Sequence, residues 1–448
     1  MNPPMIFLGF SRYSGFCNAS FHWGFTNFVT NFRLNSLQSM GCSFYIVTVS
    51  PSIVKLVSQG ALRRRANEKT LGFLIPPNLS RINSPQEEKI SLHIFSKGDR
   101  FVNTTKKLGQ QTLAFSSPPS VVGFGNAVGK KEGEGPLGAY FDYISKDDTF
   151  GEKSWEKSET AMQKKALSLA LDDARLETNS LDFIFAGDLL NQCIATAYSV
   201  RSQNRPFFGL YGACSTMAES LSLAAMTIDG GFAKKVAALT SSHFCSAERQ
   251  YRSPLEYGGQ RTPTAQWTTT GSGAVILADT GTGPYVTHVT PGKIIDKGIV
   301  DANNMGAAMA PAAYDTLKAH FQDTGRSPDD YDLIVTGDLG ALGHDIVVDL
   351  FRRDGVEIHD NYQDCGVLLF DLVKQDVHAG GSGCGCSAVV LTGYILKEMK
   401  KGKWKNILFC GTGALHSPTA TMQGESIPGI CHAVAISTKK GNGGGSDV

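Results

Sequence analysis

The sequence lacks several features that would assign it to a class of protein at once. It has no uninterrupted run of the roughly 18 apolar residues that a membrane-spanning helix needs. Its ten cysteines include no CxxC pair and are scattered from Cys17 to Cys431, which excludes a small disulfide-rich framework. Its net charge is only +1, so the chain as a whole has no electrostatic reason to bind nucleic acid. We therefore expect a globular protein of a reducing compartment, for which any association with a membrane would be peripheral.

The chain consists of two pieces of different composition. With 448 residues it is too long for one small core, which predicts two or three compact units or a duplicated domain. Residues 1–108 contain 13 Lys and Arg against 4 Asp and Glu, whereas residues 109–448 contain 29 against 37. We predict that 1–108 is an extension outside the fold. A transit peptide fits its composition; a secretory signal fits poorly, because the first cation, Arg12, follows the short apolar run Met5–Phe10.

From Gly109 onward, short apolar runs bounded by Gly, Ser or Asp alternate with helical stretches. Ser154 is placed to cap a helix that runs to about Ala174. This alternation predicts an α/β fold with largely buried sheets, and we assign residues 109–280 and 281–437 to its two halves and 438–448 to a Gly-rich tail. The predicted strands are Phe183–Ala186, Val236–Leu239, Ala274–Leu277, Leu333–Val335, Val367–Phe370 and Ile407–Cys410.

The clearest local signal is an internal repeat. Leu181–Leu189 reads LDFIFAGDL and Tyr331–Leu339 reads YDLIVTGDL, identical at five of nine positions. A weaker echo in the same order relates GFAKKVAAL (Gly231–Leu239) to GKWKNILFC (Gly402–Cys410). The chain therefore has the pattern of a tandem duplication. Two α/β halves of this kind place the loops that follow their strands around a common crevice, where ligands bind in such sheets.

A cysteine stands where a helix is expected to begin. Cys214 lies in GLYGACSTMAES (Gly209–Ser220), directly before apolar residues at helical spacing. The start of a helix is positive and has free N–H groups, so we predict a lowered pKa for the Cys214 thiol and attraction for an anion. Taken alone, a cysteine in an Ala- and Ser-rich segment is better explained as a small buried apolar residue.

Several longer phrases occur in a fixed order along the chain, and none begins before residue 109. They include AGDLLNQ (Ala186–Gln192), GACST (Gly212–Thr216), TSSH (Thr240–His243), AERQYR (Ala247–Arg252), AGGSGCGCSAVV (Ala379–Val390) and GTGALHSPT (Gly411–Thr419). With these phrases the chain resembles the thiolase-like condensing enzymes and, more closely, the stage V sporulation protein AD family of endospore-forming bacteria. The resemblance implies two duplicated α/β halves in a layered αβαβα arrangement, with a nucleophilic cysteine at the start of a buried helix.

The resemblance also implies a function. Members of this family are understood to bind dipicolinic acid (pyridine-2,6-dicarboxylic acid) and to act in its uptake, with calcium, into the developing spore. That role implies integral membrane proteins of the same uptake system as partners and a peripheral place at the inner spore membrane. A homodimer is an expectation carried over from thiolase-like folds.

The sequence departs from condensing enzymes at positions that the chemistry needs. Such enzymes present a His, with an Asn or second His, to the thioester carbonyl. Here the corresponding strand end reads TGDLG (Thr336–Gly340), and the later site reads HAGGSG (His378–Gly383), so Asp338 and Gly381 stand instead. We therefore predict a non-catalytic homologue. The alternative is an active acyltransferase that uses Cys214 as the nucleophile on a coenzyme A thioester.

We predict that the ligand-binding residues lie at the strand ends and helix starts around the crevice. For His243 a structural role is as much expected as ligand binding. For Asp188 and Asp338, capping of the segment that follows is a simpler explanation than ligand binding. We expect no cofactor and no protein-bound metal: Cys384 and Cys386 lack further ligands, and calcium is expected to arrive chelated by the ligand. The predicted ligand-binding residues are Cys214, His243, Asp188, Asp338, Gly381 and Ser382.

Limited proteolysis tests the predicted boundary of the extension. We expect a stable fragment that begins near residue 109, because the regular alternation of apolar runs starts there. Mass spectrometry of the resistant fragments measures where they begin. Protection of residues 1–108 under conditions that cleave exposed loops of the remaining chain contradicts the boundary.

Overall fold

The computed structural model describes residues 9–13, 16–20, 106–251, 261–358 and 361–440. The chain divides into two units, Met1–Asn103 and Thr104–Val448. In the first unit, β1 (Gly9–Tyr13) and β2 (Phe16–Ser20) form an antiparallel pair in which Tyr13 lies opposite Phe16. The sequence indicated no periodic element in this stretch.

The second unit contains two half-sheets with the same strand order. Each half-sheet has three neighbouring parallel strands followed by two strands that pair in antiparallel fashion. In the first half-sheet the order is β6 (Phe207–Leu210), β5 (Phe183–Gly187), β7 (Lys235–Ser242), β9 (Gly271–Ala278) and β4 (Ser120–Val128). In the second it is β12 (Tyr362–Asp364), β11 (Leu333–Thr336), β14 (Asn406–Ala414), β15 (Gly429–Ser437) and β10 (Tyr285–Thr290).

The shared strand order confirms the duplication that the repeat predicted. Asp182 and Asp332, which occupy the same position in the two copies of the repeat, make the same contacts. Asp182 accepts hydrogen bonds from the backbone N–H groups of Lys234 and Lys235. Asp332 accepts them from Lys405 and Asn406, which begin the equivalent strand. The half-sheets are joined where Tyr285 pairs with Ser120, and the short strand β3 (Leu113–Ala114) pairs with β10.

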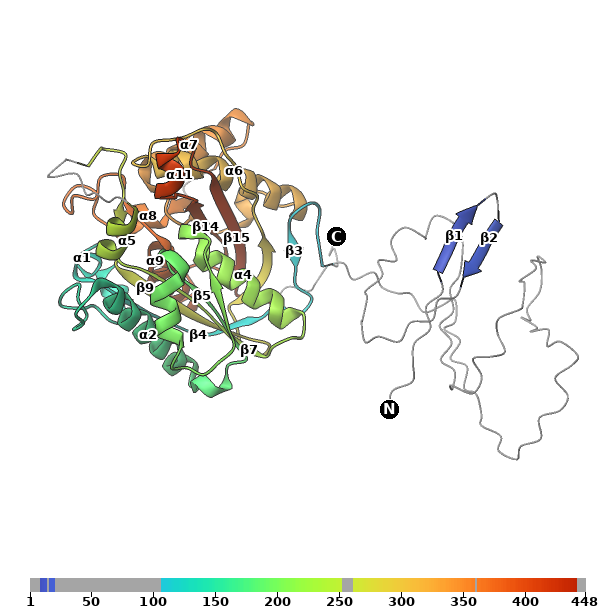
Figure 1. Ribbon diagram of the computed structural model, residues 1–448, viewed down its shortest axis with the longest axis horizontal. Coiled ribbons are helices and arrows are strands. Elements are labelled where there is room, and N and C mark those ends of the chain that lie inside the picture. The colour runs from blue at the N-terminus through green and yellow to red at the C-terminus, as the bar shows by residue number, and fades with distance from the viewer. Residues whose placement is uncertain (1–8, 14–15, 21–105, 252–260, 359–360, 441–448) are drawn as a thin grey trace, which may run out of the picture. The chain divides into compact units, whose positions relative to one another are not determined.

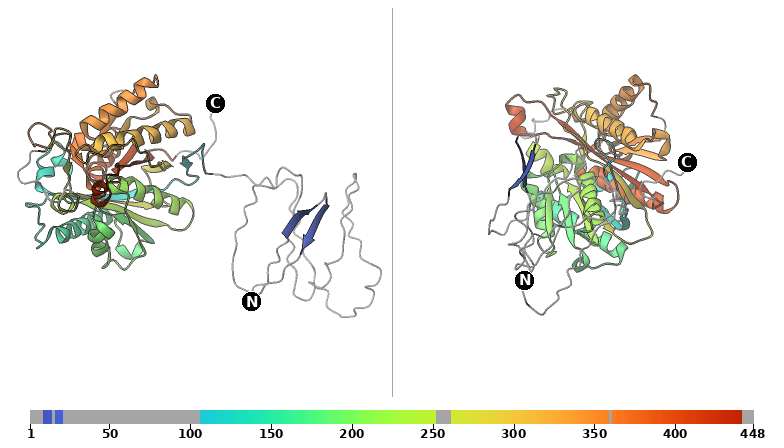
Figure 2. Two further views of the ribbon diagram at one scale, coloured as in Figure 1. Left: turned by 45° about the horizontal axis from the view of Figure 1, so that its top comes forward. Right: turned by 90° about the vertical axis from the view of Figure 1, so that its right-hand side faces the viewer.

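Helices form three layers around the two half-sheets (Figure 1). On one outer side α2 packs on β4 and β9, and on the other α6 packs on β14 and β15 beside α7. Helices α4 and α9 lie between the half-sheets, and α4 contacts strands of both. In the left view of Figure 2 the orange helices α6 and α7 remain on the opposite side from α2. The arrangement is the predicted αβαβα layering.

The helices have these bounds along the chain. They are α1 (Lys130–Gly133), α2 (Trp155–Ala174), α3 (Ile194–Val200), α4 (Thr216–Asp229), α5 (Phe244–Tyr251), α6 (Met305–Thr324), α7 (Gly340–Arg353), α8 (Cys365–Leu369), α9 (Cys384–Val390), α10 (Leu396–Lys400) and α11 (Pro418–Met422). Two further short strands, β8 (Trp267–Thr268) and β13 (Gly381–Ser382), pair in parallel. None of the helices in the described part of the chain is long and apolar enough to cross a membrane.

Local sequence explains the ends of the long helices. Ser154 caps α2 by accepting a hydrogen bond from the backbone N–H of Lys157, as predicted. Asn304 caps α6 in the same way through Ala307, and α6 ends at Gly325, whose φ of 65° suits glycine. The buried positions of α2 include Met162, Ala166 and Ala170, on the helix that packs against β4 and β9.

One predicted strand is wrong. Residues 367–370 lie not in a strand but in and just after α8, and the strand beside β11 is β12, which ends at Asp364. The Asp364 side chain accepts a hydrogen bond from the backbone N–H of Gly366, and this cap turns the chain into a helix. An apolar run of four residues fits a buried helical turn as well as a buried strand. The other five predicted strands coincide with β5, β7, β9, β11 and β14.

Candidate functional site

Two cysteines meet where the central helices begin. Cys214 lies in the short 3-10 turn Ala213–Ser215 that leads into α4, and Cys384 is the first residue of α9. Both side chains are buried in one apolar cluster with Leu189 and Ala247, against which Tyr251 packs. The duplicated halves thus bring two equivalent helix starts together at the centre of the unit.

A buried carboxylate faces the Cys214 thiol. Asp338 follows β11, is fully buried, and lies close enough to the thiol of Cys214 for the two groups to interact electrostatically. Its oxygens also accept hydrogen bonds from the Thr412 hydroxyl at 2.8 Å and from the Gly383 N–H at 2.9 Å, and the Ser382 hydroxyl lies at 3.2 Å. Asp338 therefore connects the ends of β11 and β14 with the starts of α4 and α9.

A second buried carboxylate holds the loop that carries Asp338. Asp364 accepts hydrogen bonds from the backbone N–H groups of Leu339 at 2.8 Å and Gly340 at 3.0 Å. Burial raises the pKa of Asp364 to about 6, with a further contribution from the nearby charge of Asp338. The sequence analysis did not select Asp364, because its distance of 26 residues from Asp338 gives no local pattern.

The predicted lowering of the Cys214 pKa is wrong. Burial raises the pKa of the Cys214 thiol well above its ordinary value, and the Asp338 charge raises it further. Cys214 is only 6% exposed, so loss of water outweighs the effect of the helix start. Burial likewise raises the pKa of Cys384 well above its ordinary value. The two thiols are held in their neutral form.

The structure brings some of the other predicted site residues to this centre and places others elsewhere. Ser382 reaches Asp338, whereas a side chain at Gly381 would point at Phe370 and Cys386 rather than toward the Cys214 thiol. Asp188 is buried after β5 and accepts hydrogen bonds from the N–H and hydroxyl of Thr196 at 2.7 and 2.6 Å. It caps its own loop.

His243 does not face the thiols. Its Nε2 lies 2.7 Å from the backbone carbonyl oxygen of Asp148, and its Nδ1 accepts a hydrogen bond from the N–H of Cys245. Burial lowers its pKa, which keeps the ring neutral. Its ring also packs beside Trp155, so the contacts are those of a structural histidine.

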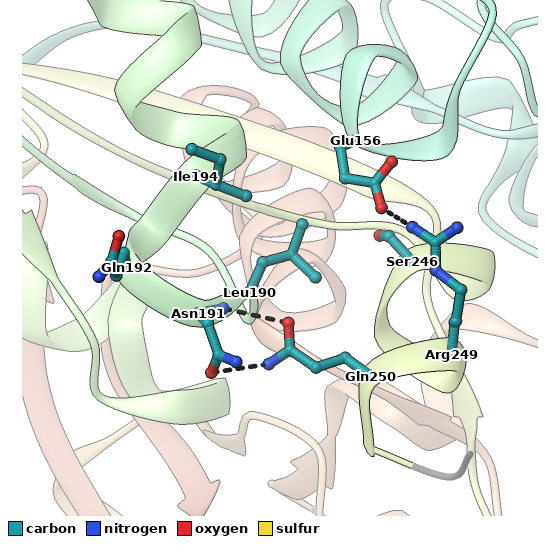
Figure 3. A pocket seen from close by; sticks show the side chains of 8 residues that line it. All are labelled: Glu156, Leu190, Asn191, Gln192, Ile194, Ser246, Arg249 and Gln250. Atoms are coloured by element: carbon teal, nitrogen blue, oxygen red, sulfur yellow. Dashed lines mark hydrogen bonds and ion pairs between the residues drawn. The ribbon is translucent and has the colours of Figure 1, made fainter. Parts of the chain in front are cut away.

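A pocket of about 700 Å³ opens beside α5 and the segment that follows β5 (Figure 3). Arg249 forms an ion pair with Glu156, while Asn191 and Gln250 are joined by two hydrogen bonds of 3.1 Å. The pocket is lined by Glu156, Leu190, Asn191, Gln192, Ile194, Ser246, Arg249 and Gln250.

The same two chain segments line the pocket and pack on the thiols of Cys214 and Cys384. Leu190 and Ser246 line the pocket, whereas their neighbours Leu189 and Ala247 pack on the thiols. The Tyr251 hydroxyl joins these two segments by donating a hydrogen bond to the backbone carbonyl of Leu189. The sequence analysis named none of the pocket residues as a site, although several belong to the phrases AGDLLNQ and AERQYR that carried the family resemblance.

Another buried carboxylate lies behind the pocket residue Ser246. Glu159 of α2 accepts hydrogen bonds from the hydroxyls of Ser241 at 3.0 Å and Ser246 at 2.9 Å. Burial and the nearby charge of Asp188 raise the pKa of Glu159 to about 8. The acid behind Ser246, a residue that lines the pocket, therefore stays largely protonated at neutral pH.

The duplicated halves, the layered helices and a cysteine at the start of a central helix define a thiolase-like protein. Solved structures with this fold include 3-oxoacyl-[acyl-carrier-protein] synthase III from Aquifex aeolicus, which is 14% identical and similar over 71% of this chain and 99% of that chain, with a TM-score of 0.44. A variant of OleA from Xanthomonas campestris is also 14% identical, over 72% and 99% of the two chains, with a TM-score of 0.48.

Within this fold the chain belongs to the Stage V sporulation protein AD family, whose model matches residues 109–437. Stage V sporulation protein AD of Bacillus subtilis (strain 168) is 46% identical over 331 residues, which cover 74% of this chain and 98% of that protein. The chain is therefore a sporulation protein with a thiolase-like fold.

Glu159→Gln should change how the stability of the protein depends on pH. Because the pKa of Glu159 is raised from 4.5 to about 8, its contribution to stability is complete below pH 4.5 and is lost as the pH rises toward 8. The amide keeps the hydroxyl contacts but cannot ionise. Relative to the unaltered chain, we expect the variant to gain roughly a few kcal/mol of unfolding free energy between about pH 5 and pH 8.

Urea unfolding at the two pH values measures this gain. Glu152→Gln at an exposed position is the matched control and should leave the pH dependence unchanged. Parallel pH profiles for Glu159→Gln and the control contradict the assigned charge state of Glu159.

Asp338→Asn should lower the pKa of the Cys214 thiol, because it removes the negative charge that opposes the thiolate. The measurement is the pH at which a small thiol reagent modifies Cys214 at half its maximal rate, followed by mass spectrometry of the peptide that contains it. Asp345→Asn, at an exposed position, is the control. A half-maximal pH that stays the same in Asp338→Asn shows that the carboxylate does not act on the thiol.

Proposed function

We propose that this sporulation protein binds dipicolinic acid, as its calcium chelate, and serves the uptake of this compound into the developing spore without catalysing condensation. Membership of the Stage V sporulation protein AD family supports the role, and the 46% identical Bacillus subtilis relative aligns with 74% of the chain. The single observation that carries the loss of catalysis is the contact between Asp338 and Cys214.

The chemistry of that contact opposes a condensing reaction. Condensation needs a thiolate to accept an acyl group and a hydrogen-bond donor to stabilise the developing oxyanion or enolate. A carboxylate beside the thiol disfavours the thiolate and repels a developing anion. His243, which the sequence offered as a site residue, has both ring nitrogens engaged with other groups. We infer that Cys214 packs and positions the helix start instead of attacking a thioester.

Without condensation, the function that we propose for this thiolase-like fold is the binding of a small ligand. The volume of about 700 Å³ in the pocket of Figure 3 exceeds the needs of a single pyridine ring with two carboxyl groups. We further propose that integral membrane proteins carry the ligand across the inner spore membrane, at which this chain acts peripherally. A homodimer remains a proposal of the same kind.

Two measurements on the full chain separate ligand binding from catalysis. Calorimetry with calcium dipicolinate should give saturable heat, and Cys214→Ala should weaken it several-fold by loosening the central helix starts. Mass spectrometry after incubation with a series of acyl-coenzyme A compounds should give the unmodified mass. Folded protein that gives no heat contradicts the binding role, and an acyl adduct that is absent from Cys214→Ala establishes the acyltransferase instead.

A further inference from the structure

The parallel strands of the first half-sheet have an end that lies opposite the thiols. Strands β6, β5 and β7 run in the same direction, and Cys214 and Asp188 follow the carboxyl ends of β6 and β5. The amino ends of these strands therefore form a separate edge of the unit. We call this edge the strand-start surface; it comprises residues 201–207, where β6 begins, and the turn 230–235, where β7 begins.

A pocket of about 500 Å³ opens on the strand-start surface. Arg201, Asn204 and Arg205 line it with polar side chains, and Pro206 and Phe207 contribute an apolar wall. The pocket of Figure 3 lies instead beyond the carboxyl end of β5, and its arginine is paired with an acid. Two arginines that line one pocket make it a candidate site for an anion.

Neutral groups hold the Arg205 side chain in place. Its Nε donates a hydrogen bond to the backbone carbonyl of Asn204 at 2.8 Å. Its Nη1 donates to the backbone carbonyls of Asn179 at 3.0 Å and Leu181 at 3.3 Å. Within the described residues, Nη2 has no hydrogen-bond partner. The carbonyl groups fix the guanidinium at the pocket but do not balance its charge.

Arg201 is exposed and has even fewer partners. Its Cζ lies 4.5 Å from the ring centroid of Tyr198, which is itself 46% exposed. An aromatic ring attracts the cation but carries no net charge. In the part of the chain that the structure describes, neither Arg201 nor Arg205 forms an ion pair with a carboxylate. Both positive charges are therefore open to an anion that enters the pocket.

An exposed aromatic side chain extends from the neighbouring turn. Phe232 is 79% exposed, and Lys234 in the same turn is also exposed. Asp182 holds this turn by accepting a hydrogen bond from the backbone N–H of Lys234 at 2.7 Å. Asp182 directly follows Leu181, whose carbonyl oxygen binds Arg205. The turn and the pocket are therefore neighbours on the strand-start surface.

The strand-start surface combines positive charge with an exposed apolar group. Its two segments contain two arginines and two lysines but no acid. The exposed acids Asp182 and Asp279 adjoin the turn through backbone hydrogen bonds with Lys234, so they balance only part of this charge. A soluble anion would use the arginines alone. A lipid surface uses both features, because anionic headgroups attract the cations and the acyl region accepts the ring of Phe232.

We propose that the strand-start surface docks on an anionic lipid bilayer. The phosphate of one headgroup enters the pocket of Arg201 and Arg205, whose guanidinium groups match the geometry of a phosphate, and the ring of Phe232 inserts beside it. The proposal rests on the proposed peripheral place of the chain at a membrane and assigns the surface that makes the contact. This orientation directs the pocket of Figure 3 away from the bilayer.

Sedimentation of the full chain with vesicles of phosphatidylglycerol or of phosphatidylcholine tests this surface. The unaltered chain should bind phosphatidylglycerol vesicles more tightly, and added salt should weaken the binding. Arg201→Gln and Arg205→Gln should each weaken it about fivefold, because each removes one cation next to the anionic surface. Phe232→Ser should weaken it several-fold by removing the inserted ring.

Matched controls lie elsewhere on the chain. Arg353→Gln removes a cation whose side chain is 72% exposed on α7, and Val373→Ser removes an apolar side chain that is 92% exposed. Both should leave vesicle binding unchanged. Circular dichroism and thermal unfolding verify that each variant is folded. Calorimetry of the same proteins with calcium dipicolinate and with inorganic phosphate completes the comparison.

The combined results separate this surface from the proposed ligand. Vesicle binding that Arg201→Gln and Phe232→Ser leave unchanged overturns the strand-start surface, and so does the absence of vesicle binding; saturable heat with calcium dipicolinate then leaves the proposed ligand intact. Inorganic phosphate that binds through Arg201 in a chain that ignores vesicles assigns the pocket to a soluble phosphate and overturns the lipid. Vesicle binding that depends on Arg201 and Phe232, without heat from dipicolinate, supports the surface and contradicts the proposed ligand.

Discussion

The burial of the Asp338 carboxylate is the constraint around which the central region is built. A buried charge is costly unless hydrogen bonds satisfy it, and Asp338 obtains them from Thr412 of β14 and from Gly383 at the start of α9. The thiol of Cys214, before α4, also interacts with this carboxylate. These partners lie up to 124 residues from Asp338 in the chain. Satisfying one carboxylate therefore determines how the two halves meet.

The Asp338 carboxylate also affects the ionisation of the buried groups around it. Asp338 and Asp364 lie close together in a buried region, and each raises the cost of ionising the groups around it. The thiols of Cys214 and Cys384 remain neutral there. Thiolates and other anions are therefore disfavoured among these buried groups.

Duplication supplied two equivalent strand ends, and the two have taken different roles. Asp188 follows β5 and caps its own loop through Thr196, whereas Asp338 follows β11 and reaches into the opposite half. The repeated aspartates Asp182 and Asp332, by contrast, keep the same backbone contacts in both halves. The structural contacts of the duplication were retained, and those near the centre diverged.

The sequence by itself determined the α/β class, the duplication, most strands and the cap at Ser154, because these depend on local apolar periodicity and on residues a few positions apart. It could not place 367–370 in a helix, since a four-residue apolar run fits either element. Only the tertiary structure decided the charge state of Cys214, its contact with Asp338, the structural roles of His243 and Asp188, and the pocket. Those properties depend on burial and on contacts between segments distant in the chain, which no local pattern encodes.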